Sequence, residues 1–379
     1  MSTPAGRLAT RQFVLLWSAS FAFFFSFYLL LPTLPLYAQR LGIAESAIGL
    51  IMGFFALSSM VMKPWAGWAA DRYGRRPLLL AGTLIFLASA LLYGWSRTAG
   101  ALLLVRIFHG AGMGLYPTSA TAIVGDLAPP ARRGEAMGFF GVASNLALAL
   151  APALGVWVAE GLGFPLLFAT SAVAGALALG LTVSVRETAP TRLRVPFSAA
   201  TVLSRDAVFP SLILFCLMAT YGVHVAFLPL YVHALERGNP GIFFMAFALV
   251  VAAVRGFTGR LSDRMGRAPV TAAGMLLAAL AMAGLALSGK LTALLLVGAL
   301  YGIGFGAANP SLMAWTVDRV SAEERGKAMG TFYTAWELGI GTGAIGFGFL
   351  LSASSFPAMF AVAAGVALLG SAAAVAHRR

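Results

Sequence analysis

Ionisable side chains inside long apolar stretches are the residues of this sequence best suited to do chemistry. Glu337 lies about eleven residues into an apolar stretch that begins near Gly326. Because a charged carboxylate is costly away from water, we expect it to be protonated, paired or in a water-filled cavity. In a cavity it is a candidate proton carrier or a counter-charge for a cationic substrate. The alternative is a structural hydrogen bond from the neutral acid to a neighbouring helix.

Three basic side chains share this setting: Arg106, His109 and His224. The permanent charge of Arg106 would adjust the proton affinity of a nearby acid or bind an anionic substrate, unless backbone carbonyls cap it. Each histidine titrates near neutral pH, or serves only as a hydrogen-bonded packing residue. We predict Glu337, Arg106 and His224 as proton-coupling residues and assign His109 to a substrate cavity.

Tyrosine, tryptophan and asparagine side chains are further cavity candidates. Facing lipid, each would leave a polar atom unsatisfied, so we expect them to face an internal cavity. With His109, the predicted cavity residues are Tyr28, Tyr116, Asn145, Tyr221, Asn309, Tyr333 and Trp336. A large apolar cavity with few polar anchors suits amphipathic compounds better than a sugar.

The elements that position these residues are long apolar runs. The 379-residue chain is 60% hydrophobic and 10% charged, with a mean hydropathy of +0.87, so it indicates an integral membrane protein. A membrane-spanning helix needs about 20 mostly apolar residues. Twelve such runs are predicted, at about 13–37, 47–68, 77–95, 99–124, 134–159, 164–185, 208–235, 241–259, 268–287, 291–317, 326–351 and 356–376.

The chain is internally duplicated. The stretch G-W-A-A-D-R-Y-G-R-R-P at 67–77 returns 192 residues later as G-R-L-S-D-R-M-G-R-A-P at 259–269. Glycines 110, 112 and 114 likewise recur at 302, 304 and 306, and Asp126 recurs as Asp318. The position that matches Glu337 is Asn145. We therefore expect two halves of one architecture.

A polar stretch separates the halves. Residues 186–205 contain four arginines and two prolines, which is typical of an exposed linker. The expected division is an N-terminal six-helix bundle (1–185), a cytoplasmic linker (186–207) and a C-terminal six-helix bundle (208–379). Of the 26 lysines and arginines, nineteen fall on the side that holds both termini, the linker and both copies of the motif. By the positive-inside rule, both termini are expected to be cytoplasmic.

Several function classes fit poorly. The net charge of +13 comes from residues between apolar runs rather than from a basic face, so nucleic acid is not an expected partner. Four histidines and the lone Cys216 offer no convincing metal site or catalytic set, so we expect no cofactor and no enzyme. A receptor or scaffold would not need two copies of the repeated loop.

Twelve helices in two similar halves, with G-x-x-x-D-R-x-G-R-R after the second, resemble the major facilitator superfamily of secondary transporters. Arg106 followed by Gly110, Gly112 and Gly114 matches a second signature of that superfamily. The run 151–156, A-P-A-L-G-V, matches only partly a third signature, typical of drug:proton antiporters. The resemblance implies parallel halves built of inverted three-helix repeats.

The repeated loop carries a predicted gating motif. Its residues are Gly67, Asp71, Arg72, Gly74, Arg75, Arg76, Asp126, Gly259, Asp263, Arg264, Gly266 and Arg267. Asp71 is a fixed negative charge for the amino end of a helix in the other half, and the arginines can pair with Asp126 and lipid phosphates. Such contacts would hold one conformational state shut. A topology anchor made only of positive charge is the alternative, but it leaves the aspartate and glycines unexplained.

We therefore expect a secondary active transporter of the inner (plasma) membrane that works by alternating access. Its expected function is proton-coupled efflux of small amphipathic or drug-like compounds. The alternative is an importer or facilitator of a small metabolite, because the fold sets no direction. Expected partners are a small-molecule substrate, protons and membrane lipids, and the resemblance implies a working monomer.

Overall fold

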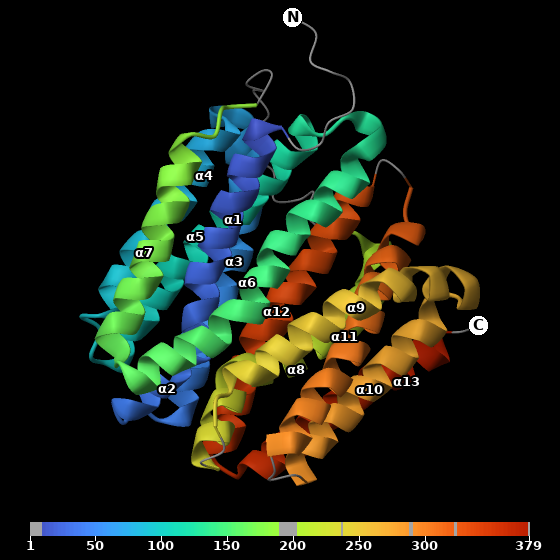
Figure 1. Cartoon of the computed structure of the whole chain (residues 1–379). Coiled ribbons are helices and arrows are strands. Elements are labelled where there is room, and N and C mark those ends of the chain that lie inside the picture. Colours follow the sequence, from blue (N-terminus) through green and yellow to red (C-terminus); the bar gives the residue numbers. More distant parts are fainter. Residues whose placement is uncertain (1–9, 189–202, 236–237, 288–290, 322–323, 378–379) are drawn as a thin grey trace, which may run out of the picture. The chain divides into compact units, whose positions relative to one another are not determined.

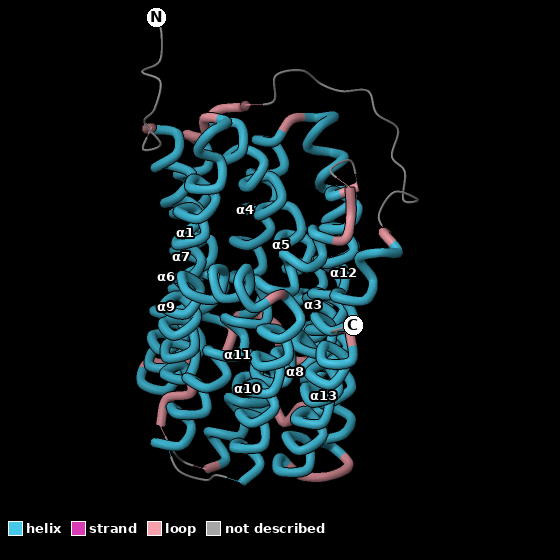
Figure 2. Tube along the Cα trace, turned by 90° about the vertical axis from the view of Figure 1, so that its right-hand side faces the viewer, coloured by secondary structure: helices cyan, strands magenta, loops and turns pink. Residues whose placement is uncertain are grey.

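The computed structural model describes residues 10–188, 203–235, 238–287, 291–321 and 324–377. The middle of the predicted linker lies outside these residues. Over the described ranges the fold is entirely helical, without strands (Figures 1 and 2). The helices are α1 (Arg11–Leu30), α2 (Thr33–Arg40), α3 (Glu45–Tyr73), α4 (Arg75–Tyr93), α5 (Ala99–Leu127), η1 (Pro130–Arg132), α6 (Arg133–Gly161), α7 (Phe164–Val183), α8 (Arg205–Ala234), α9 (Gly241–Met265), α10 (Arg267–Leu287), α11 (Leu291–Asp318), α12 (Arg325–Ser352) and α13 (Phe356–Ala376).

Twelve candidate membrane spans are present in this part of the chain, when α1 and α2 are taken together as Arg11–Arg40. The predicted fold class, an all-helical membrane protein with twelve spans, is confirmed. The first span is interrupted where Pro32 follows Leu31, and the Leu31 amide bonds back only to the Tyr28 carbonyl at 3.4 Å. A proline lacks the N–H that would continue the helix, which explains the break.

The chain forms two compact units. Unit 1 is 1–31 with 58–198, and unit 2 is 32–57 with 199–379. In unit 1, α1 packs on α6 and α7, and α4 packs on α5 and α7. In unit 2, α8 packs on α12, and α10 packs on α11 and α13. The six-helix halves expected from sequence remain a prediction.

Repeated glycines bring equivalent helices close together within each unit. In unit 2 a Cβ added to Gly274 would lie 2.7 Å from the Gly304 carbonyl oxygen. In unit 1 a Cβ added to Gly82 would lie 2.9 Å from the backbone nitrogen of Tyr116. Gly82 precedes Gly274 by the 192-residue offset. Small residues therefore allow α4 to cross α5, and α10 to cross α11, at backbone contact.

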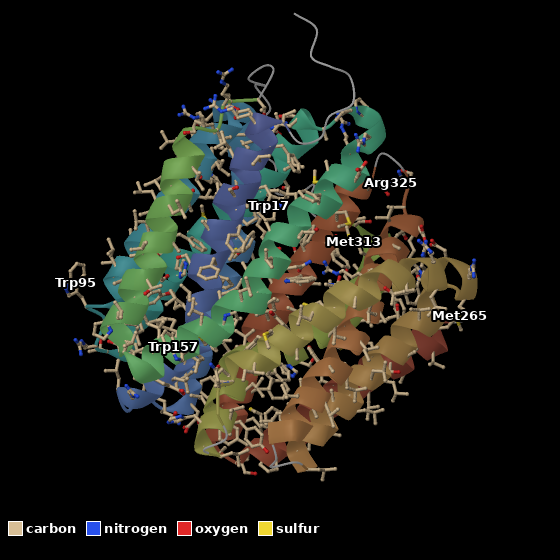
Figure 3. The ribbon with its side chains drawn as sticks, viewed as in Figure 1. Trp17, Trp95, Trp157, Met265, Met313 and Arg325 are labelled. Carbon is tan, nitrogen blue, oxygen red and sulfur yellow. The ribbon has the colours of Figure 1, made fainter. Side chains whose placement is uncertain are left out.

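Large aromatic side chains mark one end of unit 1. Trp95, which follows α4, is 76% exposed, and Trp157, near the end of α6, is 61% exposed. Trp95 projects outward from the ribbon (Figure 3). Since α4 and α6 both start at the end that carries the repeated loop, these tryptophans lie at the opposite end. Exposed tryptophans near the ends of membrane-spanning helices are typical of a membrane–water interface.

Candidate functional site

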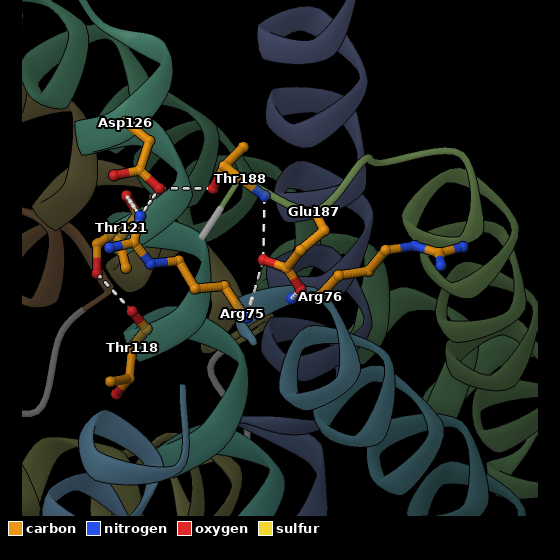
Figure 4. A network of polar contacts seen from close by, with 8 residues as sticks. Arg75, Arg76, Thr118, Thr121, Asp126, Glu187 and Thr188 are labelled. Carbon is orange, nitrogen blue, oxygen red and sulfur yellow. Dashed lines mark hydrogen bonds and ion pairs between the residues drawn. The ribbon is translucent and has the colours of Figure 1, made fainter. Parts of the chain in front are cut away.

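The first copy of the repeated loop forms a polar network in unit 1. Arg75 forms an ion pair with Asp126, near the end of α5, and donates from Nη1 to the Ala122 carbonyl at 3.1 Å (Figure 4). Arg76 donates from Nη2 to the Val183 carbonyl at 2.8 Å. Asp126 was the expected partner of these arginines, and Arg75 is the one that reaches it. The guanidinium groups thereby tie the start of α4 to the ends of α5 and α7.

A carboxylate that sequence reasoning missed completes this network. Glu187 accepts hydrogen bonds from the backbone N–H groups of Arg75 at 3.1 Å and Arg76 at 3.0 Å. Its neighbour Thr188 donates from its hydroxyl to Asp126 Oδ2 at 2.6 Å. The first N–H groups of a helix have no partner within the helix, and the positive end of the helix dipole favours an anion there. Glu187 is the acid among the arginines of residues 186–205, which was the available signal.

The second copy forms a related network in unit 2. Arg267, the counterpart of Arg75, donates from Nε to Asp318 at 2.8 Å. Its Nη1 donates to Ser262 at 3.0 Å and pairs with Asp263. Asp318 is the counterpart of Asp126, so the same arginine–aspartate pair is present in both units.

The other motif residues have different surroundings. Asp71 and Arg264 are exposed, and Arg72 lies 5.5 Å from the ring centroid of Trp68. A Cβ added to Gly67 or Gly259 would meet nothing within 4 Å. Gly74 and Gly266 have φ angles of 102° and 91°, which favour glycine. The glycines before α4 and α10 are thus explained by backbone conformation, whereas the gating role of the motif remains a prediction.

Arg106 belongs to a buried polar cluster inside unit 1. The Arg106 side chain, 2% exposed, interacts with the Tyr93 hydroxyl of α4. That hydroxyl also lies 3.0 Å from His109 Nδ1. The centroids of the His109 and Phe86 rings are 4.1 Å apart, and the rings meet edge-on at an angle of 72°. The structure therefore brings together two predicted site residues, Arg106 and His109, around a tyrosine that the sequence analysis did not select.

Tyr116 is also fully buried in unit 1. Its hydroxyl lies 3.0 Å from Ser20 Oγ, and its ring stacks on Phe23 at 3.9 Å. Tyr28 and Asn145, predicted for the same cavity, are partly buried. The Tyr116 hydroxyl thus has a hydrogen-bond partner on α1, and its role in a substrate cavity remains a prediction.

His224 lies in the core of unit 2. Its Nδ1 is 3.0 Å from the Thr220 carbonyl, which can only accept, so Nδ1 carries the proton. Nε2 then presents a lone pair and has no hydrogen-bond partner among the described residues. The centroid of the ring is 4.1 Å from that of Tyr301 and 5.0 Å from that of Phe243. Tyr301 follows His109 by 192 residues, so equivalent places in the two units hold a histidine and a tyrosine.

Glu337 lies on α12 of unit 2 and is 7% exposed. The preceding Trp336 meets the Phe305 ring edge-on at 6.0 Å, and Phe305 also contacts Tyr221 at 5.7 Å. Three helices, α8, α11 and α12, thus supply this aromatic set. Of the other cavity candidates in unit 2, Asn309 is buried and Tyr333 is 44% exposed.

No group of three or more histidine, cysteine, aspartate or glutamate side chains suited to a metal ion occurs within the ranges that the structure describes.

Comparison with known proteins gives the class to which this fold belongs. The family model of the Major Facilitator Superfamily matches residues 16–240 and 239–379. The chain therefore belongs to the Major Facilitator Superfamily, and it is a multi-pass membrane transporter of small molecules.

Individual relatives agree with this assignment. The chain is 26% identical over 380 residues to an uncharacterised MFS-type transporter, MJ1560, of Methanocaldococcus jannaschii, covering 95% of this chain and 98% of that protein. It is 28% identical over 150 residues to the quinolone resistance protein NorA of Staphylococcus aureus, covering 40% of this chain and 39% of NorA.

Solved structures share the fold. The nucleoside transporter NupG has a TM-score of 0.85 at 16% identity, with 97% of this chain and 100% of that chain covered. The peptide transporter POT has a TM-score of 0.80 at 18% identity, with coverage of 97% and 94%. At these identities the likeness concerns the fold alone.

Proposed function

We propose that this transporter is a proton-coupled exporter of small amphipathic or drug-like compounds and works by alternating access. The observation that carries the proposal is Glu337, a carboxyl group buried in unit 2 within a membrane-spanning helix. Carboxyl groups at this depth are costly and typically mark proton or substrate pathways. The partial similarity to NorA supports export of drug-like molecules.

Glu337 is assigned the role of proton carrier. Protonation removes its charge and lowers the cost of burial, so the protonated and charged forms favour different surroundings. Alternating access uses this difference if protonation and substrate binding favour different conformations. One charge that moves inward through 100 mV releases about 2.3 kcal/mol, enough for roughly a fifty-fold substrate gradient per proton.

The aromatic set supplied by α8, α11 and α12 of unit 2 is assigned to substrate binding. Trp336, Phe305 and Tyr221 offer flat apolar surfaces with a few polar atoms. Such surfaces suit amphipathic rings and provide few anchors for a sugar. His224 and Arg106 remain the other proton-coupling candidates, His224 through the unpartnered Nε2 atom and Arg106 through its permanent charge.

The two arginine–aspartate networks are assigned to the gate at the membrane face that carries the motif. Arg75–Asp126 and Arg267–Asp318 each hold the start of one helix to the end of another. We assign this face to the cytoplasm of a plasma membrane, with exposed arginines contacting lipid phosphates, and we expect a monomer to transport.

The test is substrate-triggered proton movement across liposomes that contain the purified protein and an internal pH dye. Amphipathic compounds are screened on wild type, Glu337→Gln and Glu324→Gln. Glu324 is a partly exposed carboxylate of the same unit, with 46% of its side chain accessible, and it serves as the matched control. Proton movement in wild type and in Glu324→Gln, but not in Glu337→Gln, supports the proposal. Transport without proton movement in wild type would favour the importer or facilitator alternative.

A further inference from the structure

The first residues after α7 are held from several sides within unit 1. Gln12, in α1, accepts from the Arg186 backbone N–H at 2.9 Å. Glu187 accepts from two N–H groups at the start of α4, and Thr188 donates to Asp126 of α5. The start of the linker thus contacts three helices besides the one it leaves.

Glu187 fits its place closely. A Cβ added to Gly74 would lie 2.5 Å from Glu187 Oε2. The residue before α4 must therefore be small as well as tolerant of positive φ. The two carboxylate oxygens meet different amides, Oε1 that of Arg75 and Oε2 that of Arg76. Such a two-point contact sets the orientation of the first turn of α4, from which the Arg75 side chain extends to Asp126.

Thr188 joins this contact to the ion pair. Its hydroxyl donates to Asp126 Oδ2, the same oxygen that pairs with Arg75 (Figure 4). Its own backbone N–H donates to Glu187 Oε1 at 3.0 Å. Glu187, Thr188, Asp126 and Arg75 therefore form one closed ring of contacts. Breaking any member weakens the support of the others.

Unit 2 offers an internal comparison. Gly266 precedes α10 with a φ angle of 91°, close to that of Gly74, but a Cβ there would meet only Pro269 Cδ at 3.7 Å. Arg267 is held instead by two side-chain carboxylates, Asp263 and Asp318. The duplication therefore kept the arginine–aspartate pair but supports it differently in the two units.

We propose that Glu187 and Thr188 are positioning residues of the gate. The first residues of the linker, 186–188, then contribute to the function of the first copy of the motif. The proposal rests on the gating role assigned to that motif above. When the gate opens, the Arg75–Asp126 pair and the Glu187–Thr188 contacts separate or reorganise together. The start of the linker thus biases the conformational equilibrium, although it touches neither the substrate cavity nor Glu337.

The contact itself is tested by hydrogen–deuterium exchange of the full-length protein in detergent. In Glu187→Ala, the Arg75 and Arg76 amides should exchange about tenfold faster than in wild type, the loss expected for a charge-assisted hydrogen bond at the low end of its range. Gly74→Ala should have the same effect, because its Cβ displaces the carboxylate. Gly266→Ala has the same unfavourable φ but no carboxylate beside it, so it should leave these two amides unchanged.

The positioning role is tested by single-molecule energy transfer between dyes at Arg133→Cys and Arg325→Cys, in a Cys216→Ser background. These two exposed sites are related by the 192-residue offset. Glu187→Ala should change the ratio of the two conformational populations by about threefold or more, since partly exposed charged contacts have effects of this size. Glu187→Gln, which retains an acceptor oxygen, and Thr188→Val, which keeps the side-chain shape, should shift it less and in the same direction. Glu160→Gln, an exposed carboxylate at the other end of unit 1, should match wild type.

The outcomes separate the proposals. Asp126→Asn reports on the gating role itself: if it leaves the populations unchanged, the gate assignment fails and this inference with it. A shift in Asp126→Asn without one in Glu187→Ala and Thr188→Val overturns the positioning role alone. If Glu187→Ala speeds exchange of the Arg75 and Arg76 amides but leaves the conformational populations unchanged, Glu187 is only a helix cap. If it leaves the exchange unchanged, the contact does not protect these amides. Either result contradicts the proposal. None of these measurements depends on proton coupling, which the dye assay tests separately.

Discussion

Replacing Gly304 by alanine is expected to force α10 and α11 apart inside unit 2. An added Cβ would lie 2.6 Å from the Gly274 carbonyl oxygen and 2.9 Å from the Ala278 backbone nitrogen. Both atoms belong to the backbone of α10, so neither can rotate away. The helices themselves must separate, which also weakens contacts further along the crossing.

The size of the effect follows from the cost of overpacking. An extra methyl group in a closely packed region costs about 1–3 kcal/mol. For a unit of this size each kcal/mol shifts Tm by roughly 2–4 °C, so Gly304→Ala should lower it by about 2–12 °C. The measurement is thermal unfolding of the detergent-purified protein, followed by size-exclusion chromatography of the fraction that remains folded.

Two other glycines serve as controls. At Gly112, the equivalent place in unit 1, the nearest atoms to an added Cβ are side-chain atoms, Ile85 Cγ2 at 2.7 Å and Phe86 Cδ2 at 2.9 Å, and the Gly82 carbonyl oxygen follows at 3.1 Å. The side chains can move and the backbone oxygen is less crowded than at Gly304, so Gly112→Ala should cost less than Gly304→Ala. Gly346 has nothing within 4 Å, and alanine there should be neutral or stabilising by up to about 1 kcal/mol. Equal melting of all three variants, or a larger loss in Gly112→Ala, would refute the argument from backbone contact.

Three further predictions concern the charged network, the aromatic set and the buried cluster. Arg267→Lys should reduce transport turnover several-fold, because an ammonium group cannot hold Asp318, Asp263 and Ser262 together. The control is Arg260→Lys, at an exposed position. Equal turnover in the two variants would count against the network. Phe305→Ala should raise the apparent KM for an amphipathic substrate by about tenfold, with a smaller change in turnover, because both Tyr221 and Trp336 lose a ring contact. An unchanged KM would show that these three aromatic residues are not part of the binding site. Tyr93→Phe deletes the hydroxyl that His109 contacts. The loss should lower Tm by about 2–4 °C, the equivalent of about 1 kcal/mol. A Tm equal to that of wild type would contradict a stabilising role for the hydroxyl.

The sequence was sufficient for the fold because lipid leaves little choice to an apolar run of about 20 residues. Backbone polar groups must be satisfied within the segment, so each run becomes a helix. The break after Leu31 follows from Pro32 in the same direct way. The arginine–aspartate pairing was predictable as well, since the duplication repeats Arg75 and Asp126 as Arg267 and Asp318.

The buried polar clusters were harder to predict because they depend on how each helix is rotated. In a membrane both the lipid and the protein interior are apolar, so the hydrophobic pattern does not identify the inner face. Tyr93 was overlooked for this reason, although it contacts both Arg106 and His109. Tyr116 was selected for its hydroxyl, and the hydrogen bond of that hydroxyl to Ser20 of α1 was not foreseen.

Glu187 was missed for a different reason. A stretch rich in arginine and proline indicates an exposed linker, and composition does not show that its first residues fold back onto α4 and α5. The clue lay in local chemistry: an acid follows α7, and the amino end of another helix needs an anion. Only the three-dimensional arrangement shows that the two meet.

The most direct test of the central claim compares two kinds of transport by Glu337→Gln in liposomes, using a compound that wild type exports. One is uphill accumulation driven by a pH gradient, and the other is exchange of labelled for unlabelled compound without a gradient. Glutamine keeps the size of the side chain but cannot carry a proton. We predict that Glu337→Gln loses uphill accumulation and retains exchange, while Glu324→Gln retains both. Uphill accumulation at the wild-type level in Glu337→Gln would contradict the assignment of Glu337 as the proton carrier.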